Sequence, residues 1–152
     1  MTNFALLQTN IAFNDPETNY AHVRELFAKA MQKTPRPDVV VLPEDWATGF
    51  SDVMFHHMEE LCEPLNGPSV TVCRELAKQY HVWVVAGSIS TRHEDGKMRN
   101  TTFLINRDGE IVGDYSKMHL YSDMDEDAQL VHGSKSDVFD IELGRLGFMI
   151  CY

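Results

Sequence analysis

The sequence predicts an α/β fold, because buried strand patterns and amphipathic helix patterns alternate along its first half. Val39–Leu42 and Val82–Ser88 are continuous apolar runs rich in β-branched residues, which suits strands covered on both faces. Phe4–Gln8 is predicted to be an earlier strand. The resulting order of strand, helix, strand, helix, strand is typical of an α/β layer.

Each of the two helices has its own sequence signals. Asp15 is expected to cap the first helix, with Pro16 at its first position and Thr34–Pro37 as its stop signal. Apolar residues recur between these points at three- and four-residue steps. The second helix follows Pro68, and its apolar face is Val70, Cys73, Leu76, Ala77 and Tyr80.

The second half of the chain has a different pattern. Thr101–Asn106 and Glu110–Tyr115 flank an Asp-Gly turn and predict an antiparallel hairpin. Ser116–Lys135 is polar with little helix or strand signal, and loops of this length are usually functional or disordered. Asp137–Ile141 and Leu146–Cys151 are predicted to be the last two strands.

Charge and length narrow the class of protein. Lys and Arg number 13 against 23 Asp and Glu, and the net charge of −10 disfavours nucleic acid and anionic membranes as partners. The apolar runs are far shorter than the ~20 residues that a membrane span needs.

The three cysteines form no C-x-x-C pair, and we expect a cytoplasmic protein without a signal peptide. The length suits one domain, residues 1–152, which we expect to be cut short because an apolar strand ends it.

Three chemically useful side chains follow predicted strands. Glu44 comes directly after an apolar strand, at the edge where α/β sheets bind ligands. Lys117 follows the predicted hairpin, and Cys151 ends the last strand. A thiolate needs a cation or a base nearby to react at neutral pH, and Lys117 and Glu44 could supply them. Taken alone, Glu44 and Lys117 could equally be solvated surface charges, and Cys151 could be an inert buried cysteine.

Together, Glu44 in Leu-Pro-Glu, Lys117 in Tyr-x-Lys-x-His-Leu and Cys151 in Ile-Cys-Tyr resemble the nitrilase, or carbon–nitrogen hydrolase, superfamily. The resemblance extends over essentially the whole chain and includes the Val-Ala-Gly-Ser strand and Asn100-Thr101. It implies an α-β-β-α sandwich with mixed sheets. It also implies assembly into a homodimer or a larger homo-oligomer.

The resemblance assigns a role to each of these residues. Glu44 matches the general base, Lys117 the cationic member and Cys151 the nucleophile, which would form a thioester and release ammonia. Lys117 and the backbone N–H of Tyr152 would hydrogen-bond the oxyanion. These roles need neither a cofactor nor a metal ion.

Glu126 is a fourth candidate. It stands seven residues before Gly133, where many members have an auxiliary glutamate, and we expect it to orient Lys117 and the substrate. It also fits one charge of an acidic solvated loop. The family usually has Pro before that glycine, whereas this chain has His132.

The Tyr-Ser-Lys-Met-His-Leu segment and the Glu-Lys-Glu pattern look most like the ω-amidase branch, which hydrolyses ω-amides of 2-oxo dicarboxylic acids. The expected partners are therefore a small non-peptide amide and water. A nitrilase and an N-carbamoyl hydrolase stay open, because they share the triad. A non-catalytic α/β interaction module also stays open, with Cys151 simply packed. A flavodoxin-like domain is disfavoured, because residues 9–13 contain no glycine to cradle a phosphate.

Other residues have less specific interpretations. His56 and His57 would point apart on a helix and have no third ligand at metal spacing, so no metal site is expected. Trp46 and Phe50 follow Glu44 closely and are candidates either for a pocket wall or for core packing. The remaining cysteines are expected in the core; they are Cys62 and Cys73.

Overall fold

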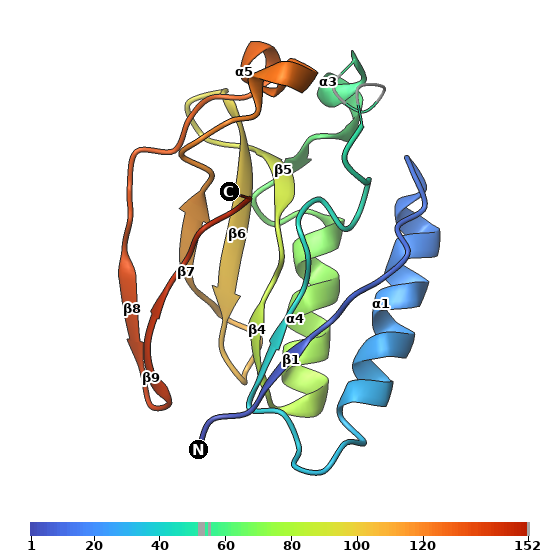
Figure 1. Ribbon diagram of the computed structural model, residues 1–152, viewed down its shortest axis with the longest axis vertical. Helices are drawn as coiled ribbons and strands as arrows, with labels where there is room; N and C mark the ends of the chain where they lie inside the picture. The colour runs from blue at the N-terminus through green and yellow to red at the C-terminus, as the bar shows by residue number, and fades with distance from the viewer. Residues whose placement is uncertain (52–53, 55, 152) are drawn as a thin grey trace.

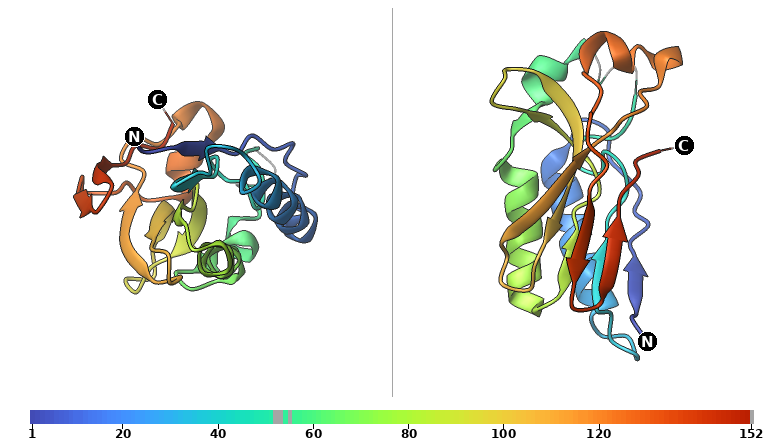
Figure 2. Two further views of the ribbon diagram at one scale, coloured as in Figure 1. Left: turned by 90° about the horizontal axis from the view of Figure 1, so that it is seen from below. Right: turned by 90° about the vertical axis from the view of Figure 1, so that its left-hand side faces the viewer.

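Two helices lie side by side on one face of a large sheet in the computed structural model, which describes residues 1–51, 54 and 56–151 (Figure 1). They are α1 (Pro16–Ala30) and α4 (Pro68–Tyr80). A small β-hairpin packs against the opposite face (Figures 1 and 2). The described residues thus form helix, sheet and sheet layers, which confirms the predicted α/β class.

The large sheet is mixed. Its described strands follow the order β1-β2-β4-β6-β5-β3, and β7 also pairs with β6. The β1–β2, β2–β4 and β3–β5 pairs are parallel, whereas β6 is antiparallel to β4, β5 and β7. The strands are β1 (Phe4–Leu6), β2 (Val39–Val41), β3 (Glu63–Pro64), β4 (Trp83–Val85), β5 (Ile89–Arg92), β6 (Met98–Ile105) and β7 (Ile111–Ser116).

The second sheet is the hairpin of β8 (Val138–Ile141) and β9 (Gly144–Gly147). Its Phe139 and Leu146 pack with Trp83 and Leu104 of the large sheet. Three short helices complete the described part of the chain: α3 (Met58–Leu61), the 3₁₀ helix η1 (Ser122–Met124) and α5 (Glu126–Gln129). Helices α3 and α5 lie at the same end of the molecule (Figure 1). No helix within these described residues is long and apolar enough to cross a membrane.

The main core fills the space between the helices and the sheet. Val23 and Phe27 of α1 and Leu76 of α4 are buried against Val40 and Val84 of the central strands. Each such side chain contributes roughly 1.5–3 kcal/mol through removal from water. This rigid layer supports the ends of β2 and β4, where the candidate site begins.

Several boundaries confirm the predictions. Helix α1 begins at Pro16, and the Asp15 side chain accepts a hydrogen bond from Thr18 N at 3.2 Å, as the capping signal predicts. Helix α4 begins at Pro68. Strands β6 and β7 form the predicted antiparallel hairpin.

The predicted strand Val82–Ser88 is wrong in its extent. Strand β4 ends at Val85, and β5 begins at Ile89 on the far side of a break. Gly87 makes this break with φ +65°, and a Cβ there would lie 2.1 Å from the carbonyl oxygen of Pro43. The close approach of these two loops therefore requires glycine and interrupts the strand.

Two further predictions need correction. The polar stretch 116–135 contains η1 and α5, because a buried glutamate anchors α5 in place of an apolar face. The predicted strand Leu146–Cys151 is also wrong, since β9 ends at Gly147. Residues 148–151 pair with no described strand, and Met149 is 91% exposed.

Candidate active site

Glu44 lies in a loop that backbone hydrogen bonds hold against the break after β4. Ser88 N donates to Pro43 O at 3.1 Å, and the indole Nε1 of Trp46 donates to Ala86 O at 2.8 Å. Trp46 is fully buried and packs in the main core, which is one of the two interpretations its sequence position allowed. These contacts position the Glu44 side chain at the carboxyl end of β2, as the sequence predicts.

Lys117 comes from the segment directly after β7. Its N–H donates to Asn100 O and its carbonyl accepts from Gly133 N, each at 2.8 Å. A Cβ on Gly133 would lie 2.0 Å from the carbonyl oxygen of Ser116, so this close approach of two chain segments requires glycine. The Lys117 side chain is consequently held inside the protein with 0% exposure.

The Lys117 ammonium joins two carboxylates that are far apart in the sequence. Its Nζ lies 2.8 Å from Glu44 Oε1, 2.8 Å from Glu126 Oε2 and 3.1 Å from Glu126 Oε1. Burial by itself would lower the pKa of Lys117, but the hydrogen bonds and charges of Glu126 and Glu44 outweigh it and raise that pKa. The lysine is therefore a permanent cation at neutral pH.

Glu126 is the first residue of α5 and is completely buried. Its Oε2 also accepts a hydrogen bond from Tyr121 N at 2.6 Å. The structure thus brings Glu126 to Lys117, and the interpretation of Glu126 as a solvated loop charge is wrong. The neighbouring acidic residues Asp123, Asp125 and Asp127 are the ones exposed to solvent.

Cys151 lies in the extended segment after β9, with φ +64°, and is exposed. It lines a pocket of about 140 Å³ together with Glu44, Ser88 and Thr102. The structure therefore places the predicted base and the predicted nucleophile in one pocket. The predicted oxyanion donor, the N–H of Tyr152, lies outside the described residues.

Two polar residues belong to this site although the sequence did not assign them to it. Asn100 of β6 donates its Nδ2 to Glu44 Oε1 at 3.0 Å and to Glu126 Oε1 at 3.5 Å. Asp45 is 1% exposed, and burial together with the charges of Glu44 and Glu126 raises its pKa well above the usual range. The available signals were the Asn100-Thr101 pair at the start of the predicted hairpin and a second carboxylate in Leu-Pro-Glu-Asp.

The other residues singled out from the sequence have different surroundings. The Phe50 ring centroid lies 5.4 Å from Lys117 Nζ and 6.5 Å from the Tyr121 ring centroid, so Phe50 contributes a cation–π contact to the site. Cys73 is buried in the main core, as predicted, whereas Cys62 is only partly buried and packs beside Met58. Burial raises the pKa of the Cys62 thiol to about 11.

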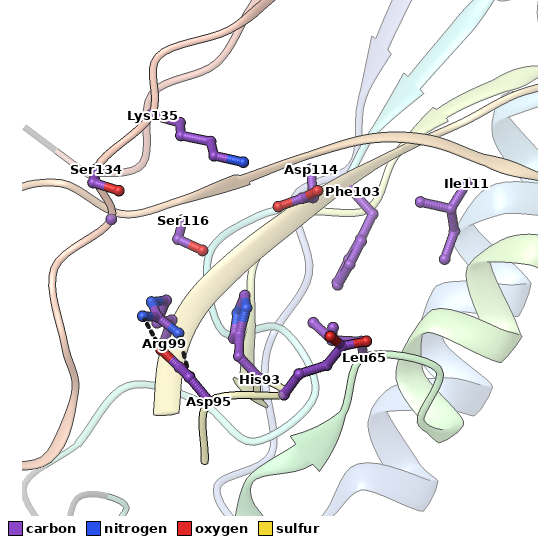
Figure 3. A pocket seen from close by; sticks show the side chains of 12 residues that line it. Leu65, His93, Asp95, Arg99, Phe103, Ile111, Asp114, Ser116, Ser134 and Lys135 are labelled. Carbon is purple, nitrogen blue, oxygen red and sulfur yellow. Dashed lines mark hydrogen bonds and ion pairs between the residues drawn. The ribbon is translucent and has the colours of Figure 1, made fainter. Parts of the chain in front are cut away.

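A larger pocket of about 590 Å³ lies elsewhere, and Figure 3 shows its lining. Arg99 and Phe103 of β6 line it, and Asp95 holds Arg99 through two hydrogen bonds of 3.0 and 2.7 Å (Figure 3). Side chains alternate between the two faces of a strand, so these residues point away from Asn100. None of the residues that line this pocket belongs to the Glu44–Lys117–Glu126 cluster.

The site combines two carboxylates, an ammonium and a thiol. In the portion of the chain that the structure describes, no group of three or more His, Cys, Asp or Glu side chains is placed to hold a metal ion. The acidic side chains of the cluster are instead bound to the Lys117 ammonium. A buried carboxylate–ammonium arrangement beside a cysteine is suited to nucleophilic and general acid–base chemistry.

The chain belongs to the carbon–nitrogen hydrolase family, whose sequence profile matches residues 3–152. It is 31% identical over 146 residues to the 2-oxoglutaramate amidase of Bacillus subtilis, covering 96% of this chain and 54% of that protein. It is also 32% identical over 149 residues to a protein of Staphylococcus aureus named hydrolase in agr operon, covering 97% of this chain and 55% of that protein.

The solved structures agree. The crystal structure of Saccharomyces cerevisiae Nit3, a member of branch 10 of the nitrilase superfamily, superposes with a TM-score of 0.87 at 29% identity. The match covers 99% of this chain and 55% of that chain. The yeast protein is named omega-amidase NIT3. The chain therefore spans about half the length of the curated relatives it matches, and its fold is that of the nitrilase superfamily.

Proposed function

We propose that the protein hydrolyses a small non-peptide amide to a carboxylic acid and ammonia, as an ω-amidase-type carbon–nitrogen hydrolase. The observation that carries the proposal is the Lys117 ammonium bound to Glu44 and Glu126, with Glu44 and Cys151 in one pocket. Further support comes from relatives named 2-oxoglutaramate amidase and omega-amidase.

In the proposed acylation step, Cys151 Sγ attacks the amide carbon while Glu44 takes the thiol proton. The carbonyl electrons move onto oxygen, where Lys117 and the N–H of Tyr152 would stabilise the negative charge. When the carbonyl re-forms, the C–N bond breaks and Glu44 returns its proton to the nitrogen, which leaves as ammonia. The acyl group is then held as a thioester on Cys151.

Deacylation uses the same groups in reverse. Glu44 takes a proton from water, and the resulting hydroxide attacks the thioester carbon. A second oxyanion forms and collapses, the C–S bond breaks, and the proton returns to sulfur. The net reaction consumes one water molecule and yields the acid and ammonia. A buried, permanently charged Lys117 suits both oxyanions, because it needs no reorganisation between the steps.

Glu126 is proposed to orient Lys117 without entering the chemistry. It is fully buried, and both of its carboxylate oxygens accept from the ammonium. Tyr121 N also holds the Glu126 carboxylate at 2.6 Å. With two of its three hydrogens on Glu126, the ammonium directs the third to Glu44, which lines the pocket.

The pocket supports a small substrate. A volume of about 140 Å³ suits a short-chain amide, since a water molecule occupies about 30 Å³ in the liquid. The Ser88 and Thr102 side chains give the lining a polar side, and Leu42 and Phe148 give it an apolar side. Its described lining includes no lysine or arginine, so these residues do not themselves supply the cation that a substrate carboxylate would need.

A screen for ammonia release tests the proposal. Small amides, including ω-amides of 2-oxo dicarboxylic acids, are incubated with the full-length protein and with Cys151→Ala, alongside matched nitriles and N-carbamoyl compounds. We expect release from amides that disappears in Cys151→Ala. Preferential turnover of nitriles or N-carbamoyl compounds would instead establish one of the sister activities. Equal rates in the parent and Cys151→Ala would reject the cysteine mechanism, and no turnover of any substrate would favour an interaction module.

We further propose a homo-oligomer in the cytoplasm. Exposed apolar side chains occur on strands at the ends of the pairing order, including Phe4 and Leu6 of β1, and on β7, including Ile111 and Val112. Such side chains are candidates for burial by other parts of the full-length protein or by a second copy. Analytical ultracentrifugation of the full-length protein tests the oligomer, and a sedimentation coefficient of one monomer would reject it.

A further inference from the structure

Asp45 has an unusual environment beside Glu44. It is 1% exposed, and its Oδ1 has no hydrogen-bond partner among the residues that the structure describes. Its Oδ2 has one contact, with Asn100 Nδ2 at a long 3.5 Å. An ionised carboxylate so poorly supplied with donors would be costly to bury.

Asn100 also has a buried oxygen without a hydrogen-bond donor. Its Nδ2 donates to Glu44 Oε1 at 3.0 Å, but its Oδ1 also has no partner in the described structure. Asn100 is likewise 1% exposed. Two buried acceptor oxygens, one on each of two adjacent side chains, therefore lack a donor. A single proton on Asp45 converts one of these acceptors into a donor for the other.

The charge of the cluster favours that proton. Glu44 and Glu126 each hold a short hydrogen bond from Lys117, whereas no Lys117 hydrogen bond reaches Asp45. Burial first, and then the negative charges of Glu44 and Glu126, raise the pKa of Asp45 well above its usual range, with Lys117 opposing them. One ammonium among three ionised carboxylates would leave two uncompensated charges, and protonation of Asp45 reduces this excess to one.

We propose that Asp45 is a neutral carboxylic acid in the working site and that its O–H bonds Asn100 Oδ1, which holds the Asn100 amide nitrogen on Glu44. A carboxylic acid and a primary amide can form two parallel hydrogen bonds, O–H to the amide oxygen and N–H to the acid carbonyl. Asp45 is then a positioning residue that acts through Asn100. Its effect on turnover rests on the proposed amidase function, whereas its protonation does not.

The pairing has a specific consequence for the base. If the Asn100 amide rotated by 180°, its oxygen would face Glu44 and repel the carboxylate. The Asp45 O–H prevents this rotation, because it requires the amide oxygen on its own side. Glu44 is thereby supplied with two fixed donors, Asn100 Nδ2 and Lys117 Nζ. Preorganisation of this kind is what a general base needs to meet a thiol and then a water molecule.

Infrared difference spectroscopy tests the protonation without any substrate. The full-length parent is compared at pH 7 with Asp45→Asn and with the control Asp95→Asn, whose carboxylate is held ionised by Arg99. We expect a protonated-carboxyl band that shifts in D₂O, disappears in Asp45→Asn and persists in Asp95→Asn. A parent spectrum in which Asp45→Asn removes only carboxylate absorbance would overturn the proposal.

Activity tests the positioning role. An asparagine at position 45 can donate to Asn100 Oδ1 and accept from Asn100 Nδ2. The kcat/KM of Asp45→Asn should therefore stay within about threefold of the parent at pH 7. The kcat/KM of Asp45→Ala should fall by up to about 100-fold, mainly through kcat. Asp45→Asn should also resist the activity loss at alkaline pH that ionisation of Asp45 causes in the parent. Equal losses in Asp45→Asn and Asp45→Ala would overturn the role.

The two readouts separate the possible failures. If no amide is turned over, the proposed function fails, and the infrared band still decides the state of Asp45. In that case the rate of Cys151 alkylation replaces kcat/KM as the measure of the positioning role. If amides are turned over and the band is absent, only the inference on Asp45 fails.

Discussion

The two faces of β6 carry polar sites of opposite character. On one face, Asn100 lies among Glu44, Lys117 and Glu126, where Lys117 and Glu126 are 0% exposed. On the other face, Arg99 pairs with Asp95 at the margin of the larger pocket, where the two side chains are 17% and 46% exposed. The same strand therefore supports one cluster that is buried at Lys117 and Glu126 and reaches the surface at Glu44, which is 26% exposed, and one ion pair at the surface.

The difference shows that pocket size does not indicate where the chemistry lies. A solvent-exposed ion pair gains little, because water and salt screen it. A buried cluster must satisfy nearly every donor and acceptor, since an uncompensated charge there is expensive. Proteins hold such costly arrangements mainly where function requires them, so the smaller pocket beside Glu44 is the better candidate.

The largest expected effect comes from removing the buried cation. Lys117→Met leaves Glu44 and Glu126 without their shared ammonium and should destabilise the protein by about 3–5 kcal/mol. Urea denaturation of the full-length protein measures this change. Lys135→Met, at the larger pocket, is the matched control and should stay close to the parent. Adding Glu126→Gln to Lys117→Met should recover part of the loss, and a failure to do so would contradict the buried-charge explanation.

Removing the proposed base, Glu44, should affect the reaction more than the fold. Glu44→Gln keeps the shape of the side chain but cannot take a proton, so we expect kcat to fall by about 10²–10⁴-fold. Iodoacetamide labelling of Cys151 near neutral pH should slow as well. Glu94→Gln, from the lining of the larger pocket, should change neither rate. Unchanged labelling in Glu44→Gln would show that Glu44 does not activate the Cys151 thiol.

Asp45 provides a pH test of the buried cluster. Its pKa is higher in the folded protein than in the unfolded chain, so the folded state binds the proton more tightly. The parent should therefore lose stability as pH rises above about 4. The free energy of unfolding should fall by about 1.4 kcal/mol for each pH unit until the pH reaches the pKa of Asp45 in the folded protein. Asp45→Asn removes this loss and should be more stable than the parent at pH 7. Denaturation midpoints between pH 4 and 8 check the sign, and a parent that gains stability relative to Asp45→Asn would contradict it.

The smallest effect is expected at the exposed pair. Asp95→Asn removes a carboxylate whose pKa Arg99 and the Lys97 N–H hold low. The parent should be slightly the more stable at neutral pH, and this advantage should shrink in acid, because Asp95 takes up a proton in the unfolded chain before it does so in the folded protein. Thermal melts at pH 7 and pH 2 measure the change. If Asp95→Asn lost as much stability as Lys117→Met, the proposed difference between the buried cluster and the exposed ion pair would be contradicted.

Local patterns were sufficient for much of the scaffold. The apolar periodicity and the Asp15 and Pro68 signals predict α1 and α4 at the positions observed. They were insufficient where contacts distant in sequence decide the backbone. The break at Gly87 depends on the approach of Pro43, and the end of β9 depends on which strands are available to pair with it.

The residues of the site also divide into those that the sequence indicated and those that only the tertiary structure placed there. The positions of Glu44, Lys117 and Cys151 after predicted strands made them candidates, and the resemblance of their motifs to the nitrilase superfamily assigned them, together with Glu126, to one site. Only the tertiary structure placed Asp45 and Asn100 in the site. Their importance comes from burial and from the donors each one lacks, and these are properties of the space between segments 26 to 56 residues apart. A sequence determines which groups are available, whereas the dielectric and the partners that set their protonation exist only after the chain has folded.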